Sequence, residues 1–147
     1  MIFLLDTNIL LHYIRESSVF HEIQATYAPL SKGNRSVISV VNVAEIRSLA
    51  VKSDWGILKT RKLEEILREF IIIEIRNGIL IDRYVQIDTF SQNKLLGQPL
   101  GLTPRNMGKN DLWIAATASV LGAKLLTTDG DFNHLHGVFL DLEQFSH

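Results

Sequence analysis

Short apolar runs alternate along the chain with longer segments in which apolar residues recur every three or four positions. The runs are typical of strands buried on both faces of a sheet, and the spaced segments of helices that bury one face. Strands are predicted at residues 2–5, 37–40, 71–75 and 124–128, with a weaker fifth at 138–140. Helices are predicted at about 8–15, 19–30, 42–52, 57–70, 79–95 and 110–121. The alternation predicts a single α/β domain over residues 1–147, with a parallel β-sheet flanked by α-helices.

Composition narrows the classes of protein. Hydrophobic residues make up 46% of the chain and charged residues 21%, which excludes a largely disordered protein. The absence of cysteine excludes disulfides and cysteine-ligated metals, and it fits a cytoplasmic location. The formal net charge of -1 gives no general attraction for nucleic acid, so phosphate contact would need a local basic patch or a metal ion. No apolar run approaches the ~20 residues that span a membrane, and we expect neither a membrane segment nor a signal peptide.

Four carboxylates stand where predicted strands end or in the helices beside them. Asp6 follows the first strand and Asp129 the fourth, while Glu45 and Asp111 lie in the first turns of two helices. Because parallel strands end at one edge of a sheet, these side chains are expected to converge. Converging carboxylates repel one another unless a cation lies between them. Oxygen ligands without cysteine or a histidine cluster favour Mg²⁺ or Mn²⁺.

Each acid also has an ordinary structural explanation. Asp6 would cap the following helix, Asp111 would be favoured by a helix N-terminus, and Asp129 would belong to a turn. Glu45 is harder to explain, because its apolar neighbours predict a mostly buried segment, where a glutamate needs a partner. One metal site accounts for all four positions together.

Two short polar residues adjoin the acids. Asn8 lies just after Asp6, and Thr128 immediately precedes Asp129. Side chains of this kind orient metal-binding carboxylates by hydrogen bonds, so both are candidates for that role. Helix capping for Asn8 and strand propensity for Thr128 stay open as alternatives.

The segments that carry these residues resemble the PIN-domain ribonucleases, and within them the VapC-type toxins of bacterial and archaeal toxin–antitoxin pairs. Each segment alone is weakly specific, but all four occur in the family's order over essentially the whole chain. The segments are Phe3-Leu4-Leu5-Asp6-Thr7-Asn8, Val41-Asn42-Val43-Ala44-Glu45, Asn110-Asp111-Leu112-Trp113-Ile114-Ala115-Ala116 and Leu125-Leu126-Thr127-Thr128-Asp129-Gly130-Asp131-Phe132.

The resemblance implies a metal-dependent endoribonuclease acting on RNA, often structured RNA such as tRNA. It implies inhibition by a small antitoxin protein, and commonly a toxin homodimer. It adds Asp131 as a further acid at the metal site, although capping of the segment at Phe132 stays open for that residue. The Mg²⁺ or Mn²⁺ ligands that it implies are Asp6, Glu45, Asp111, Asp129 and Asp131.

Basic residues must hold RNA beside an acidic site. Residues 97–109 form the one clear loop, rich in glycine and proline, and loops of this length in compact domains usually have a function. Its cations Arg105 and Lys109 are therefore candidate substrate contacts. Phe20 and Trp55 are candidates for contact with a partner, but core positions explain them better. A solvated helix face is also the better explanation for Lys59, Arg61, Lys62 and Arg68.

Other functions fit less well. A phosphatase of the haloacid dehalogenase type needs a second Asp where this chain has Asn8, and no Walker-type glycine-rich loop occurs. Two alternatives stay open: a non-catalytic RNA-binding or protein-interaction module of the same fold, and a nuclease acting on structured DNA. The complete acidic set argues against a pure RNA binder, since clustered negative charge repels RNA.

Overall fold

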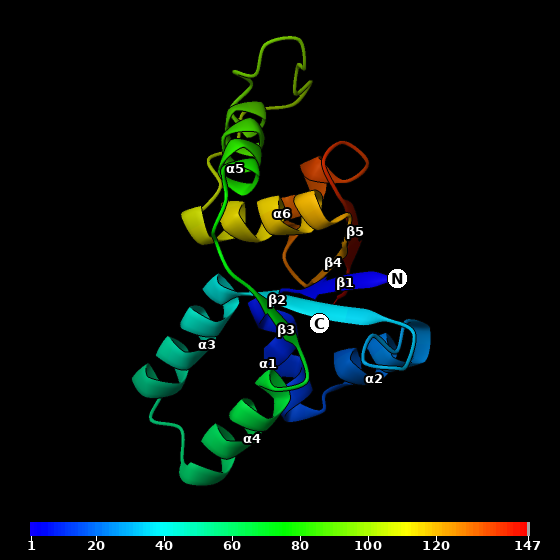
Figure 1. Ribbon diagram of the computed structural model, residues 1–147, viewed down its shortest axis with the longest axis vertical. Helices are drawn as coiled ribbons and strands as arrows, with labels where there is room; N and C mark the ends of the chain where they lie inside the picture. The colour runs from blue at the N-terminus through cyan, green and yellow to red at the C-terminus, as the bar shows by residue number, and fades with distance from the viewer. Residues whose placement is uncertain (147) are drawn as a thin grey trace.

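The computed structural model describes residues 1–146, which form a parallel sheet with helices on both faces (Figure 1). The strand order is β3-β2-β1-β4-β5, and each neighbouring pair is parallel, which confirms the predicted α/β architecture. None of the helices in the described part of the chain is long and apolar enough to cross a membrane. The elements are β1 (Ile2–Leu5), α1 (Thr7–Arg15), α2 (Ser18–Thr26), β2 (Arg35–Ser39), α3 (Val40–Lys52), α4 (Ile57–Leu67), β3 (Ile71–Ile73), α5 (Gly78–Ser91), α6 (Lys109–Leu121), β4 (Lys124–Thr127), the 3-10 helix η1 (Gly130–Leu135) and β5 (Asp141–Gln144).

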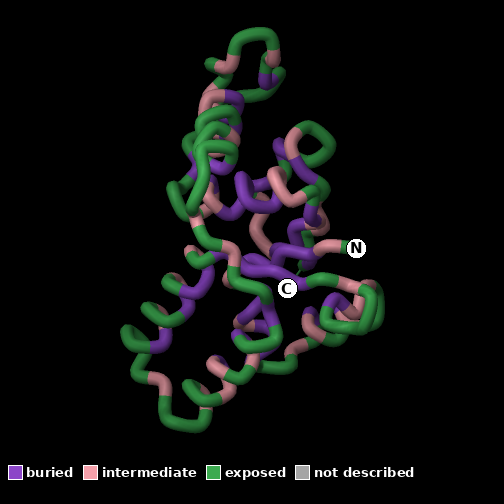
Figure 2. Tube along the Cα trace, in the orientation of Figure 1, coloured by how far each residue is buried: buried purple, intermediate pink, exposed green. Residues whose placement is uncertain are grey.

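The sheet separates two hydrophobic cores. Successive side chains of a strand point to opposite faces, so Phe3 and Leu5 of β1 join one core and Leu4 joins the other. Helices α1 to α4 cover the first face, and α5, α6 and η1 cover the second. Figure 2 shows the buried segments gathered along the sheet and the helix faces turned toward it. Burial on both faces explains why β1 is a continuous apolar run.

The fifth strand is where the prediction was wrong. Residues 138–140 are not a strand: they belong to a turn in which Gly137 N–H donates to Leu140 O at 2.9 Å. The strand β5 follows at Asp141–Gln144 and pairs in parallel with β4. An edge strand buries little of its surface, so β5 carries no apolar run that would mark it in the sequence.

Three helices end earlier than their apolar patterns predict. Helix α4 ends at Leu67, before the predicted end at residue 70. Helix α2 ends at Thr26, because Ala28 takes a positive φ of 43° and so leaves the helical region. Helix α5 ends at Ser91, and Asn93 has a φ of 59°. The chain then runs from residue 92 to 108 without helix or strand and projects beyond α5, at the top of Figure 1. This segment contains the predicted loop except for Lys109, which is the first residue of α6.

Candidate metal centre

The predicted acids meet at the carboxyl edge of the sheet, where the strand order changes direction. Strand β1 has β2 on one side and β4 on the other, and Asp6 follows β1 directly. Asp129 comes shortly after β4, Asp111 lies in the first turn of α6, and Glu45 lies in α3. A crevice at such a switch point is the usual ligand site of an open α/β sheet.

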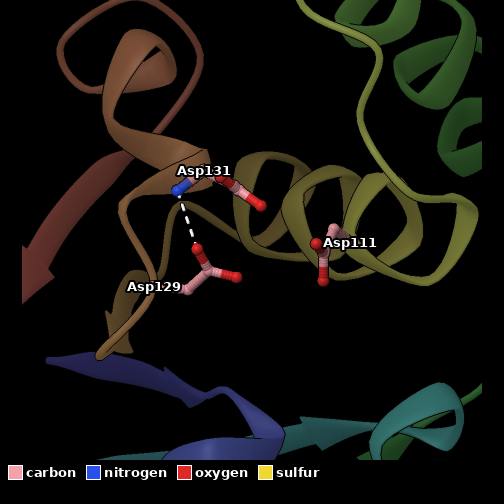
Figure 3. Close-up of side chains that lie close together, drawn as sticks. All are labelled: Asp111, Asp129 and Asp131. Carbon is pink, nitrogen blue, oxygen red and sulfur yellow. Dashed lines mark hydrogen bonds between the residues drawn. The ribbon is translucent and has the colours of Figure 1, made fainter.

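Three of the acids form a tight group. Asp111, Asp129 and Asp131 each offer a carboxylate oxygen, and these oxygens lie within 4.8 Å of one another (Figure 3). Asp129 also accepts a hydrogen bond at 2.9 Å from the Asp131 N–H and is the N-cap of η1. The capping role that stayed open for Asp131 therefore belongs to Asp129, and the Asp131 carboxylate extends toward the group.

Asp6 is fixed and buried at the centre of this edge. One of its oxygens accepts from the Thr7 N–H at 2.8 Å, which caps α1, and the other accepts from Thr127 Oγ1 at 2.8 Å. Burial raises the pKa of the Asp6 carboxyl to about 6, even though both hydrogen bonds lower it. Nearby Glu45 and Asp129 raise this pKa further by charge repulsion. Asp6 is thus fixed in place at a position that disfavours its negative charge.

Asp111 shows that all five acids interact. Burial, followed by repulsion from the other acids, raises the pKa of Asp111 to about 7. The charged form of Asp111 is therefore disfavoured, and none of the ion pairs among the described residues includes Asp111. The repelling acids, in decreasing order of effect, are Asp6, Asp129, Glu45 and Asp131.

Two threonine hydroxyls position the acids. Thr127 Oγ1 donates to Asp6 and accepts from the Asp129 N–H at 3.0 Å, so it links the ends of β1 and β4. Thr7 Oγ1 donates to Glu45 Oε1 at 2.8 Å and accepts from Asn42 Nδ2 at 3.0 Å. The two hydroxyls thereby hold one oxygen of Asp6 and one oxygen of Glu45, and the Thr7 N–H holds the other oxygen of Asp6.

The residues whose hydroxyls bind the acids lie one position before the predicted Asn8 and Thr128. Asn8 is exposed on α1, and within residues 1–146 its side chain makes no hydrogen bond to the acids. Thr128 Oγ1 is buried without a hydrogen-bond partner in the same part of the chain. The register pairs Leu5 of β1 with Leu126 of β4, which brings the next residues, Asp6 and Thr127, together. That register is not visible in the sequence.

Replacing Thr127 with valine should lower the free energy of unfolding by about 1–3 kcal/mol, because it leaves the buried Asp6 oxygen and the Asp129 N–H unpaired. Urea unfolding measures the loss. The matched control is Thr128→Val, which removes a buried hydroxyl that has no partner and should be neutral or stabilising. Equal destabilisation by both variants would contradict the assignment of Thr127.

Glu45 is less enclosed than its neighbours in the sequence predict. It is half-buried, Ala44 is exposed, and Val40 at the start of α3 is 37% exposed. The expectation of a mostly buried segment was therefore wrong. Val43 and Ile46 fill the core, whereas Val41 and Ala44 line an open groove beside the acids.

The two candidate substrate contacts border the acids at different places. Arg105 lines a cavity of about 210 Å³ with Asp131, and Lys109 lines one of about 430 Å³ with Glu45 and Asp111. The loop that carries Arg105 is attached to the end of α5, since the Arg105 N–H donates to the Ser91 carbonyl at 2.7 Å. Contact of either cation with a phosphate stays a prediction.

The other basic cluster lies on α4, away from the acids. Lys59 Nζ sits 4.0 Å from the centre of the Trp55 ring, and Lys62 forms an exposed ion pair. Phe20 and Trp55 both pack against the first core, as the core interpretation requires. Two further members of the cluster line a groove that contains no site carboxylate: Arg61 and Arg68.

Comparison with known proteins identifies the family and the fold of this chain. A family model described as the PIN domain matches residues 3–138. The fold is similar to a chain of VapBC2 from Rickettsia felis bound to a DNA fragment from their promoter, with a TM-score of 0.76, 26% identity, and coverage of 99% of this chain and 100% of that chain. It is also similar to FitAcB from Neisseria gonorrhoeae, with a TM-score of 0.66, 26% identity, and coverage of 91% and 92%.

A third structure, VapBC-1 from nontypeable Haemophilus influenzae, shares the fold with a TM-score of 0.72, 24% identity and coverage of 98% of both chains. A search of curated protein sequences finds no significant match. The family model spans most of the chain, and all five acids lie within the residues that it matches, whereas β5 lies beyond them. The chain therefore belongs to the PIN-domain family.

Proposed function

We propose that this protein is the toxin of a toxin–antitoxin pair and that it is a metal-dependent endoribonuclease acting on structured RNA such as tRNA. PIN domains are nucleases, and the similar structures include VapBC2 and FitAcB. The observation that carries the proposal is the convergence of five carboxylates, three of them with oxygens within 4.8 Å, at the switch point of the sheet.

The donor set fits Mg²⁺ or Mn²⁺. Every candidate ligand is a carboxylate oxygen, the donor that these ions prefer. Oxygens within 4.8 Å of one another need only small side-chain rotations to reach a common ion at about 2.0–2.1 Å. Burial is the largest cause of the raised pKa values of Asp6 and Asp111, and repulsion from the neighbouring acids adds to it. A bound cation would relieve that repulsion, which supports the proposal. We assign the ion to Asp6, Asp111, Asp129 and Asp131, with Glu45 at its edge.

Each group at the site has a separate proposed role in phosphodiester hydrolysis. When bound, the ion would activate a water and neutralise charge on the phosphate. Asp6 is immobilised by its two hydrogen bonds, so it would hold the ion in a fixed position. Glu45 has one oxygen held by Thr7, which leaves the other to accept a proton from the attacking water. Arg105 and Lys109 hold the phosphates on either side of the acids.

An antitoxin is the proposed partner at the turn between α3 and α4. Val51, Ile57 and Leu58 are 78%, 77% and 80% exposed there, beside a groove lined by Trp55. Exposed apolar patches of this kind mark protein contact sites. A homodimer belongs to the same proposal, and its support is the exposed apolar side chains on the edge strand β3 and the following helix α5: Ile71, Ile72, Ile79, Ile81 and Val85. Sedimentation of the purified chain tests it.

The proposed activity is tested by incubating the purified protein with total cellular RNA and mapping the new ends. We expect discrete cuts with Mn²⁺ or Mg²⁺ and none with a chelator. Absence of cleavage by folded, metal-binding, antitoxin-free protein in both metals would favour the non-catalytic module. Metal-dependent cutting of structured DNA, with RNA left intact, would favour the alternative nuclease.

A further inference from the structure

A groove of about 510 Å³ leads away from the acids along α3. Glu45, Ser48 and Lys52 line one side of it, since residues three and four apart share a helix face. Thr7 and Asn110 line it at the end nearest the acids. Metal binding explains Glu45 and Thr7, but it explains neither the length of the groove nor the polar side chains at its far end.

This groove continues a path that crosses the whole site. The cavity beside Asp131 opens next to Asp111, because their oxygens lie within 4.8 Å of each other. Asp111 lines the central cavity, and that cavity shares Glu45 and Asn110 with the groove on α3. The path therefore has the acids at its middle and a cation in each part. These cations, in order, are Arg105, Lys109 and Lys52.

The lining of the groove suits one strand of nucleic acid. Val41, Ala44 and Leu49 provide an apolar surface for a base or ribose, while Ser48 and Lys52 offer donors to a phosphate. Cations that track a backbone beside surfaces that accept bases are the general means of binding single strands. The acids themselves repel phosphate, so affinity must come from such flanking contacts.

We propose that the RNA strand runs along this path, and that Ser48 and Lys52 bind a phosphate beyond the scissile one. Lys52 lies two turns after Glu45, about 10 Å along the helix axis, so its ammonium group reaches the strand well outside the metal centre. The inference rests on the proposed function and adds to it a phosphate-binding site on α3.

The test measures binding of a fluorescein-labelled oligouridylate to the Asp6→Asn variant in Mg²⁺ over a range of salt concentrations. Adding Lys52→Ala should weaken binding roughly five- to tenfold and reduce the slope of log K against log salt by about 0.7, the value for one phosphate contact on a single strand. The matched control is Lys32→Ala, an exposed lysine that precedes β2 at the opposite edge of the sheet. It should change neither quantity.

Two results would overturn the inference. One is an unchanged salt slope for Lys52→Ala, including the case in which the variant only lowers the melting temperature, because a cation near the end of α3 also stabilises the helix dipole. The other is equal weakening by Lys32→Ala, because any surface cation would then have the same effect as Lys52. Failure of the proposed function is separate, since it appears as wild-type protein that does not cleave RNA with either metal.

Discussion

Replacing Asp6 with asparagine should reduce metal-dependent RNA cleavage by on the order of 10³-fold or more, while the protein stays folded. Asparagine keeps the size of the side chain and an oxygen that can accept the Thr7 N–H at the start of α1. It removes the negative charge by which this position would hold a cation. Because burial already disfavours that charge, the metal-free variant should be at least as stable as the wild type.

Opposite effects on activity and stability distinguish a functional acid from a structural one. Cleavage is followed with a labelled RNA, and folding by circular dichroism and thermal unfolding. Asp54→Asn is the matched control, because Asp54 is exposed at the turn between α3 and α4, and its loss should leave cleavage unchanged. Full activity in Asp6→Asn would remove Asp6 from the metal site.

The convergence of the acids could be predicted because it depends only on topology. Asp6 and Asp129 follow strands, and parallel strands deliver whatever follows them to one edge. The hydroxyl partners could not be predicted, because they depend on register. A shift of one residue between β1 and β4 would place Thr128 in the position that Thr127 occupies opposite Asp6. No apolar pattern in strands this short determines that choice.

The groove on α3 escaped prediction for a different reason. In the sequence, Lys52 is an ordinary cation near a helix end, and Ser48 an ordinary polar residue on an exposed helix face. Their significance depends on Asn110, which comes from the start of α6 and lines the same groove. Contacts between helices on opposite faces of the sheet are set by packing, so residues on such grooves carry no local signal.

In the metal-free protein, the free energy of unfolding should fall as pH rises from about 4 to about 7. The pKa of Asp6 is raised from 3.8 to about 6 and that of Asp111 from 3.8 to about 7. Between these values the folded protein retains protons that the unfolded chain has released, so rising pH favours unfolding. Below this window both carboxyls are protonated in the folded and the unfolded protein, so no buried charge destabilises the fold. Above this window both carboxyls are charged in the folded and the unfolded protein, so the full cost of burying their charges is present.

Thermal unfolding in chelator, between about pH 5 and about pH 8, measures this dependence against the Asp111→Asn variant. The variant removes one of the two titrating acids and relieves repulsion on Asp6, so its stability should fall less steeply with pH. Mg²⁺ or Mn²⁺ should then stabilise the wild type more at the upper end of the range, where binding no longer has to displace protons. A wild-type slope in Asp111→Asn, or metal stabilisation independent of pH, would show that the acids do not act as one charged site.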